Sequence, residues 1–254
     1  MLELSTDPGL HPTARANARG PYVGAPRGAH PIRRFARDAA LDRLLRELYA
    51  GFGPQQWWPA RTPFEVIVGA ILTQNTAWRN VELALANLRA HERMSPRRLL
   101  DAAPDELAAL VRPAGYYNAK AKKLHAISAW YLDVGGLPAL KRRALGPLRA
   151  ELLDVHGVGP ETADSILCYA AGRRSAVVDT YTRRILSRHG WLDADANYEA
   201  IRAWLEERLV DARVVYEEFH ALFVRAGYDN CKPTARCETC PSVVKAASSG
   251  GAAR

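Results

Sequence analysis

The sequence lacks any long hydrophobic run. Its 254 residues contain no stretch of about 18 consecutive apolar residues, the length that a membrane span needs. No charged-then-apolar segment of the kind that directs secretion opens the chain. We therefore expect a cytoplasmic protein with no membrane partner, associated with the nucleoid if its source is bacterial.

Cysteine is scarce as well, and its few positions are uneven. The chain has four cysteines, of which Cys231, Cys237 and Cys240 lie close together. In a reducing compartment such a cluster favours metal ligation over disulfide bonds. The fourth, Cys168, lies in an apolar helical pattern, where a buried free cysteine is ordinary.

Acidic residues are fewer than basic ones. The chain has 35 Lys and Arg against 27 Asp and Glu, a formal net charge of +8. This balance favours a polyanionic partner without identifying it, and a merely soluble basic protein stays the alternative. Residues 1–33 hold prolines, glycines and arginines without an apolar period, which predicts a disordered basic tail.

Helical periodicity covers most of the remaining chain. Thr62 is the predicted N-cap of an apolar helix, and further helices are predicted near 77–90, 96–112, 197–209 and 213–226. The helix near 96–112 should break at Pro104. The pattern predicts a fold that is close to all helical.

Residues 147–170 predict two helices joined by a tight hairpin. Apolar residues recur at helical spacing before and after Gly157-Val158-Gly159. The two glycines suit a turn that needs positive φ or close backbone approach. Backbone N–H groups at such a turn favour a phosphate, so Gly157, Val158, Gly159 and Thr162 are candidate nucleic-acid contacts. Taken alone, the turn is also compatible with an ordinary connection between packed helices.

Asp179 lies 20 residues after Gly159, in the run Val-Val-Asp-Thr-Tyr. Taken alone, the pattern predicts a helix N-cap. A carboxylate can also stabilise an oxocarbenium-like sugar or activate water. Both roles can hold together, because capping keeps the carboxylate ionised. Arg183, on the helix that follows, is a candidate DNA contact.

The hairpin and the aspartate together resemble the helix-hairpin-helix (HhH-GPD) DNA glycosylases of the endonuclease III superfamily. In that family a Leu-x-x-x-x-Gly-Val-Gly-x-x-Thr-Ala hairpin is followed by Val-Asp-Thr, which bears the catalytic aspartate. The resemblance implies an all-α fold of two helical lobes flanking a DNA-binding cleft. One lobe would hold residues 61–173, and the other 34–60 with 174–254, including a cysteine loop at 231–240. The implied partner is double-stranded DNA containing damaged bases, and we expect a monomer.

A second stretch is most similar to the 3-methyladenine DNA glycosylase III branch of that superfamily. It reads Trp57-Trp58-Pro and then Phe-Glu-x-x-Val-Gly-Ala-x-Leu-Thr-Gln74-Asn75-Thr. Without the resemblance, adjacent tryptophans predict a core plug or a surface that stacks on a base. The resemblance makes both tryptophans candidates for a base pocket. It also places Gln74, with Asn75 beside it, in the gap that a flipped base leaves.

Two positions bear on the type of reaction. In bifunctional members a lysine two residues after the second hairpin glycine forms a Schiff base with the sugar. This chain has Glu161 there, so the resemblance favours a monofunctional glycosylase that uses water, acting on alkylated purines. Lys120, with Lys122 and Lys123, lies in the first turns of a helix predicted within 114–131, where lysine is slightly unfavourable to the helix dipole. A phosphate contact is therefore the preferred role for Lys120.

Two other functions stay open. One is an endonuclease III-type glycosylase and AP lyase for oxidised pyrimidines, with another lysine such as Lys120 in the Schiff-base role. The other is a protein that binds lesions or DNA and is catalytically weak.

The resemblance also implies a cofactor. The family holds a [4Fe–4S] cluster with four cysteines, and Cys231, Cys237 and Cys240 match three of them. Ala246 stands at the fourth position. The sequence is compatible with a cluster that has a non-cysteine ligand or an open iron, with a zinc site, or with a loop of free thiols; the cluster is the preferred prediction.

Overall fold

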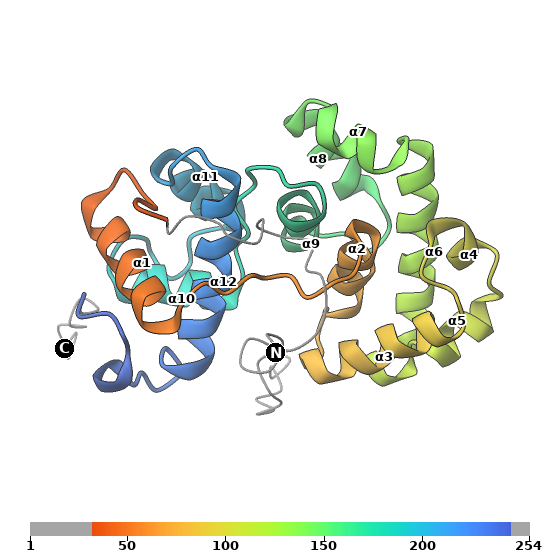
Figure 1. Ribbon diagram of the computed structural model, residues 1–254, viewed down its shortest axis with the longest axis horizontal. Helices are drawn as coiled ribbons and strands as arrows, with labels where there is room; N and C mark the ends of the chain where they lie inside the picture. Colours follow the sequence, from red (N-terminus) through yellow and green to blue (C-terminus); the bar gives the residue numbers. More distant parts are fainter. Residues whose placement is uncertain (1–31, 245–254) are drawn as a thin grey trace. The chain divides into compact units, whose positions relative to one another are not determined.

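The computed structural model of the chain describes residues 32–244 (Figure 1). Within that range the chain is helical, and its only extended pairings are two isolated bridges, Ala36–Leu209 and Cys231–Ala235. The predicted all-α fold is confirmed. No helix among the described residues is long and apolar enough to cross a membrane. The tail predicted for residues 1–33 lies, except for its last two residues, outside the described range.

The chain packs into two compact units. Among the described residues, one unit holds 58–173, and the other holds 32–57 together with 174–244. The expected division of the chain into two folding lobes stays a prediction.

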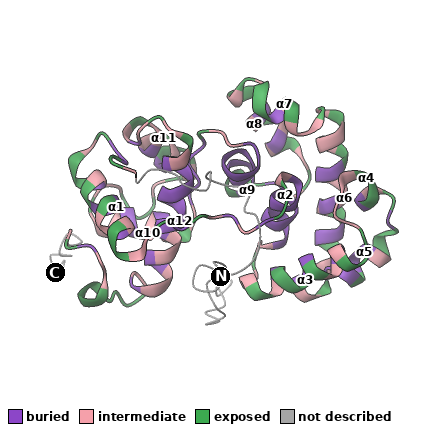
Figure 2. Cartoon of the chain, viewed as in Figure 1, coloured by how far each residue is buried: buried purple, intermediate pink, exposed green. Residues whose placement is uncertain are grey.

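The first unit is built around one buried helix. Its helical elements are α2 (Pro63–Leu72), α3 (Trp78–Ala90), α4 (Pro96–Leu100), α5 (Pro104–Leu110), η3 (Arg112–Ala114), α6 (Tyr117–Asp133), α7 (Gly136–Arg142), α8 (Leu145–Asp154), α9 (Pro160–Ser165) and the π-helical η4 (Ile166–Ala170). Nine of the ten residues of α2 are buried (Figure 2). It contacts α3, α6, α9 and η4, which explains why a helix that is apolar on all sides fits there.

The second unit is also built around a buried helix. Its helical elements are α1 (Ala39–Phe52), α10 (Thr180–Arg188), α11 (Tyr198–Arg208), α12 (Arg213–Asp229) and η5 (Cys237–Thr239). The central helix is α12, which contacts α1 and α10. Its buried residues include two carboxylic acids and a histidine, Glu217, Glu218 and His220.

Several helix ends lie where short sequence signals predict them. Thr62 caps α2 by accepting a hydrogen bond from the Glu65 N–H at 3.1 Å. The predicted break at Pro104 is present, because α4 ends at Leu100 and Pro104 begins α5. Helix α7 was not predicted. It begins at Gly136, directly after Gly135; both glycines have positive φ, and a glycine pair predicts a turn rather than a helix.

Candidate functional site

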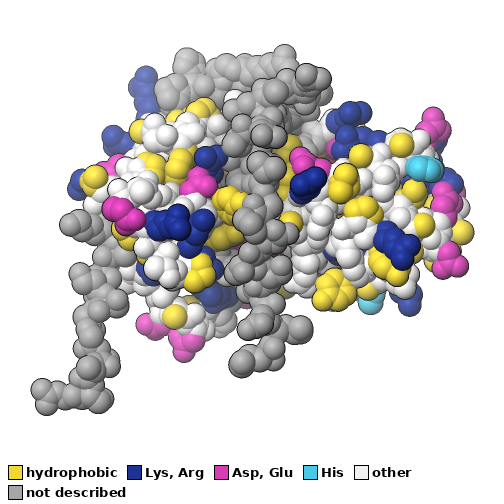
Figure 3. All heavy atoms as spheres, turned by 90° about the horizontal axis from the view of Figure 1, so that it is seen from below, with side chains coloured by type: hydrophobic (Ala, Val, Ile, Leu, Met, Phe, Trp, Pro, Cys, Tyr) yellow, Lys and Arg dark blue, Asp and Glu magenta, His cyan; other side chains and the backbone are white. Residues whose placement is uncertain are grey.

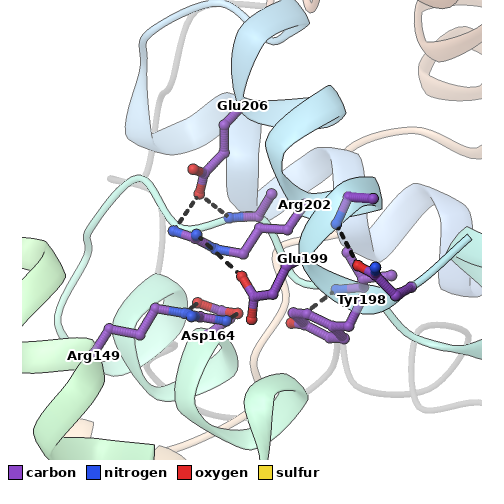
Figure 4. Close-up of polar contacts among 10 residues, drawn as sticks. Arg149, Asp164, Tyr198, Glu199, Arg202 and Glu206 are labelled. Carbon is purple, nitrogen blue, oxygen red and sulfur yellow. Dashed lines mark hydrogen bonds and ion pairs between the residues drawn. The ribbon is translucent and has the colours of Figure 1, made fainter.

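The hairpin between α8 and α9 is held from within its own unit. Arg149 donates from Nε and Nη2 to the two oxygens of Asp164, at 2.8 and 2.9 Å (Figure 4). Asp164 is fully buried, so this bidentate ion pair fixes α8 against α9. Gly157 adopts φ 82°, and a Cβ there would lie only 2.4 Å from Cγ of Lys123. The turn therefore needs glycine at 157 for both conformation and space.

Gly159 is different from Gly157. Its φ is −94°, and a Cβ there would meet nothing within 4 Å. Of the two reasons expected for glycine in this turn, positive φ applies to Gly157 and not to Gly159, for which close backbone approach stays a prediction. Because Gly159 is exposed and the chain itself does not require a glycine there, the open space is available to an external backbone. Val158 does not fit its predicted contact, since its side chain is buried and its N–H donates to Val155 O at 3.0 Å.

Gln74 lies at the centre of a hydrogen-bond network that joins the loop after α2 to the hairpin, to α9 and to α6. Its Nε2 donates to Gly157 O and to Thr162 Oγ1, both at 3.0 Å. Its Oε1 accepts from Lys123 Nζ at 2.6 Å. Both ends of the amide are thus engaged inside the protein. The predicted insertion of Gln74 into DNA would require these bonds to break, so the structure favours a role in fixing the hairpin.

Lys120 has a structural position that the sequence did not reveal. Its side chain is 1% exposed, and Nζ donates to Leu72 O at 2.9 Å and to Ala114 O at 2.6 Å. Burial, with a smaller contribution from the nearby charge of Lys123, lowers the pKa of Lys120 to about 8. The ammonium group is enclosed and already bonded, so this arrangement does not favour the expected phosphate contact by Lys120.

By joining those two carbonyls, Lys120 brings together the loop after α2 and the turn before α6. Each carries an exposed residue in the left-handed region, Asn75 at φ 53° and Tyr116 at φ 46°. Tyr116 is 69% exposed, one of few large apolar side chains so exposed among the described residues. An exposed aromatic in a conformation that costs roughly 1–2 kcal/mol is a candidate for function. The sequence signal was available, since Tyr116 directly follows a glycine before a helix.

Asp179 is the N-cap of α10, as predicted. One of its oxygens accepts from the Thr182 N–H at 2.7 Å, and the other lies 3.7 Å from Nε2 of His220. Burial by itself would raise the pKa of the Asp179 carboxyl. The contact with His220 and the bond from Thr182 outweigh it and hold this pKa below its usual value. The carboxylate is therefore ionised at neutral pH and cannot donate a proton.

The extended segment before Asp179 is anchored by α11. Glu206 accepts a hydrogen bond from the Ala176 N–H at 3.2 Å, and the hydroxyl of Tyr198 accepts one from the Val178 N–H at 3.4 Å (Figure 4). Arg202 in turn bonds Glu206 at 2.8 Å. These contacts fix the direction in which the chain enters α10, and so the placement of the Asp179 carboxylate.

Two further candidates have distinct positions. Glu161 is exposed in the first turn of α9, where a negative charge is favourable to the helix dipole. Arg183 was expected to contact DNA. Its guanidinium instead donates to the carbonyl of Ala196, so the structure gives it a role inside its own unit.

The adjacent tryptophans have separate environments. Trp58 is 3% exposed and packs against Trp78 and Tyr169, with ring centroids 5.4 and 5.6 Å away. Both faces of this environment are protein, so the structure favours the core-plug alternative for Trp58 over a place in a base pocket. Trp57 is half-buried and remains the candidate of the pair.

The cysteine loop does not fit a four-cysteine cluster. Among residues 32–244, no group of three or more His, Cys, Asp or Glu side chains is arranged to hold a metal ion. Cys231 Sγ instead accepts from Arg188 Nη1 at 3.1 Å, and the same nitrogen donates to Lys232 O at 2.6 Å. Ala246 lies outside the described residues and offers no thiol.

Basic side chains are spread over the surface. On the face drawn in Figure 3, Lys and Arg occur in small groups with Asp and Glu between them. Among the coloured residues visible on this face, basic side chains do not form one continuous strip. DNA contacts must be argued from particular groups rather than from overall charge.

Comparisons with known proteins find relatives of this chain among DNA repair proteins. Residues 68–210 match the family model described as "HhH-GPD superfamily base excision DNA repair protein". The protein of Methanocaldococcus jannaschii named "Putative DNA repair glycosylase MJ1434" is 44% identical over 79% of this chain and 93% of its own length. Endonuclease III of Thermotoga maritima is 31% identical over 79% of this chain and 89% of its own. The structure of Helicobacter pylori 3-methyladenine DNA glycosylase bound to 1,N6-ethenoadenine aligns with TM-score 0.64 and 29% identity, over 74% of this chain and 96% of that one.

Proposed function

The chain belongs to the HhH-GPD superfamily of base excision DNA repair proteins and is a DNA glycosylase of that superfamily, and we propose that it removes alkylated purines by hydrolysis without cutting the strand. It binds damaged DNA, as HhH-GPD glycosylases do. The observation that carries the proposal is the Asp179 carboxylate, which caps α10 and lies 3.7 Å from His220, in a chain with Glu161 at the lysine position of bifunctional members.

The chemistry of the reaction suits a single ionised carboxylate. The bond between the sugar C1′ and the base nitrogen breaks with its electron pair leaving on the base, and positive charge develops on the sugar. Asp179 stabilises that charge, water adds at C1′, and the water's second proton goes to solvent. A purine methylated at N3 or N7 is already cationic and leaves as a neutral base. It therefore needs no proton from the enzyme, and Asp179 has none to give.

The same geometry bears on the lyase alternative. A Schiff base needs an accessible neutral amine near the sugar. Glu161 has no amine, and the buried Nζ of Lys120 is bonded to two carbonyls. These observations support hydrolysis over lyase chemistry. The [4Fe–4S] cluster plays no part in this proposal, because the described thiols do not fit it.

DNA contacts are proposed for two places in the first unit. The exposed Gly159 would let a phosphate approach the start of α9, with Gly157 and Thr162 shaping the turn behind it. Asn75 and Tyr116, exposed on neighbouring loops, would fill the gap in the duplex when the base is flipped out. Tyr116 offers a flat ring that can stack on bases.

Trp57 is proposed to contact the flipped base. The Helicobacter pylori relative is bound to a modified adenine, which supports a purine substrate in this chain. A large aromatic surface favours an extended, electron-poor purine through stacking.

A panel of duplexes tests the proposal. Each carries one lesion: 7-methylguanine, 1,N6-ethenoadenine, uracil, thymine glycol or none, and each reaction is divided into alkali-treated and untreated halves. We expect strand breaks at 7-methylguanine in the treated half alone; breaks there at 1,N6-ethenoadenine as well would show that a neutral alkylated purine is also released. Breaks at thymine glycol in untreated samples would support the lyase alternative and overturn the proposal, and binding with no base release from any lesion would leave only a DNA-binding protein.

A further inference from the structure

The segment that leads into Trp57 is fixed by a buried carboxylate. Glu218, in the middle of α12, is 4% exposed. Its Oε2 accepts from the Gln55 N–H at 2.8 Å, and its Oε1 accepts from the Gln56 N–H at 2.9 Å. Each oxygen thus binds a different backbone group of two consecutive residues. This arrangement sets both the position and the orientation of the backbone immediately before Trp57.

The segment would not adopt this conformation by itself. Gly53 has φ 73° and Gln56 has φ 48°, so the chain twice enters the left-handed region. For a residue such as Gln56 this costs roughly 1–2 kcal/mol and requires support from the surroundings. The Gln55 side chain gives part of that support, donating to Gly53 O at 2.8 Å. Glu218 gives the rest by binding the N–H of Gln56 itself.

Holding a loop with a buried carboxylate costs stability, because the charged group must be desolvated. Burial raises the pKa of Glu218 and the charge of Glu217 adds to that effect, while the bonds from Gln55 and Gln56 oppose both. An apolar side chain would fill the same space in α12 without a desolvation cost. Two directed hydrogen bonds, however, fix a backbone where apolar packing would let it shift. This desolvation cost is explained if function depends on the position of Trp57.

The same helix also contacts the proposed catalytic residue. His220 lies two residues after Glu218 and faces Asp179, with Nε2 3.7 Å from the carboxylate. Residues two apart on a helix project from different sides. Within the second unit, α12 therefore separates the Trp57 segment from Asp179 and sets the spacing between them.

We propose that Glu218 is a positioning residue for recognition of the damaged base and that it acts through Trp57. This rests on the proposed function, in which Trp57 contacts the flipped base. Glu218 itself touches neither base nor sugar. It holds the backbone before Trp57, so that the indole meets the base in one fixed orientation relative to Asp179.

The test replaces Glu218 with glutamine. Glu218→Gln keeps the side-chain size but places an amide NH₂ against a backbone N–H, so one hydrogen bond becomes a clash of two donors. We expect KM for an ethenoadenine or 7-methylguanine duplex to rise about tenfold with kcat nearly unchanged. Glu217→Gln is the matched control, because Glu217 is equally buried on the same helix and bonds Arg213 instead. It should leave KM unchanged.

A double-mutant cycle separates positioning from stability. In a Trp57→Ala background, Glu218→Gln should raise KM no further, because the residue it acts through is gone. An equal loss in both backgrounds, or an equal rise in KM for Glu217→Gln, would overturn the inference. If Glu218→Gln does not fold, Glu218→Asp, which keeps both oxygens on a shorter side chain, enters the same cycle. Failure of the proposed function is separately visible, since wild-type protein would then release no alkylated purine.

Discussion

The central helices of the two units, α2 and α12, are both buried but contain different residues. Of the nine buried residues of α2, eight carry no charge, and the ionisable one, Glu65, pairs with Arg89. The buried set of α12 includes Glu218 and His220, which contact the Trp57 segment and Asp179. Burying polar groups costs stability that apolar packing does not. The difference indicates that α2 serves packing, whereas α12 also holds proposed functional groups in place.

The units also differ in how their functional loops are tied. In the first unit, lysines of α6 hold the loops, through Lys120 to two carbonyls and through Lys123 to Gln74. In the second, acids of α11 and α12 hold the segments before Asp179 and Trp57. A cationic frame suits a unit proposed to meet phosphates, and an acidic one suits a unit proposed to stabilise a sugar cation.

The largest effect is expected at Asp179. Asp179→Asn keeps the size of the side chain and its ability to cap α10, but removes the charge. Single-turnover base release should fall by about a hundredfold or more, or about 3 kcal/mol in the barrier, as removal of one preorganised electrostatic group does elsewhere. Affinity for the lesion duplex, measured by fluorescence anisotropy, should be nearly kept. Unchanged release would leave Asp179 only as a helix cap, and the chemical role of the second unit would be lost.

The next prediction concerns Lys120, which bridges two loops of the first unit. Lys120→Met leaves two buried carbonyls without their donor and should cost roughly 2–4 kcal/mol of unfolding free energy in urea titrations. Lys122→Met is the matched control, since Lys122 is exposed on the same helix and should change stability by less than about 0.5 kcal/mol. Equal losses in the two variants would contradict the bridging role of Lys120.

Lys120 also predicts a pH dependence. Its folded-state pKa of about 8 lies below the ordinary 10.5, so the folded protein binds fewer protons than the unfolded chain between these values. Stability contributed by this group should therefore rise with pH across that window. The rise is expected in wild-type protein relative to Lys120→Met, with unfolding followed by circular dichroism at several pH values. Parallel profiles for the two proteins would show that the lysine titrates normally.

A smaller effect is expected at the hairpin. Gly159→Val adds a branched side chain where nothing in the protein opposes it, so folding should be kept. If DNA approaches this point, affinity for an abasic-site duplex should fall about tenfold, or about 1.4 kcal/mol. Gly146→Val, also exposed and also without a Cβ contact, is the control on α8 and should bind normally. Normal binding by Gly159→Val would reduce the hairpin to a structural turn.

Much of the fold was accessible from local sequence signals. Caps at Thr62 and Asp179, the break at Pro104 and the hairpin glycines act over a few residues, and their predictions are confirmed in outline. The direction of long side chains was not accessible. Lys120 is buried because two carbonyls distant in sequence receive it, and no local pattern reports that.

The candidate site was predicted less completely for the same reason. The sequence treats Trp57 and Trp58 alike, but Trp58 is buried against the rings of Trp78 and Tyr169 whereas Trp57 is half-buried. Glu218 and His220 were missed because polar residues in a helical pattern usually indicate a solvated face. The sequence did contain a signal: apolar residues lie on so many sides of α12 that no fully solvated face is left for these polar residues.

Borohydride trapping on one duplex tests most directly whether the enzyme releases the base by hydrolysis at Asp179 without a lysine intermediate. Wild-type protein is incubated with a 7-methylguanine duplex and sodium borohydride, and free base and covalent complexes are measured in the same samples. We predict free base and no trapped protein in these samples and, in a parallel sample without borohydride, an abasic strand that breaks only in alkali. Base release accompanied by efficient trapping would show that an amine attacks the sugar, and would contradict it.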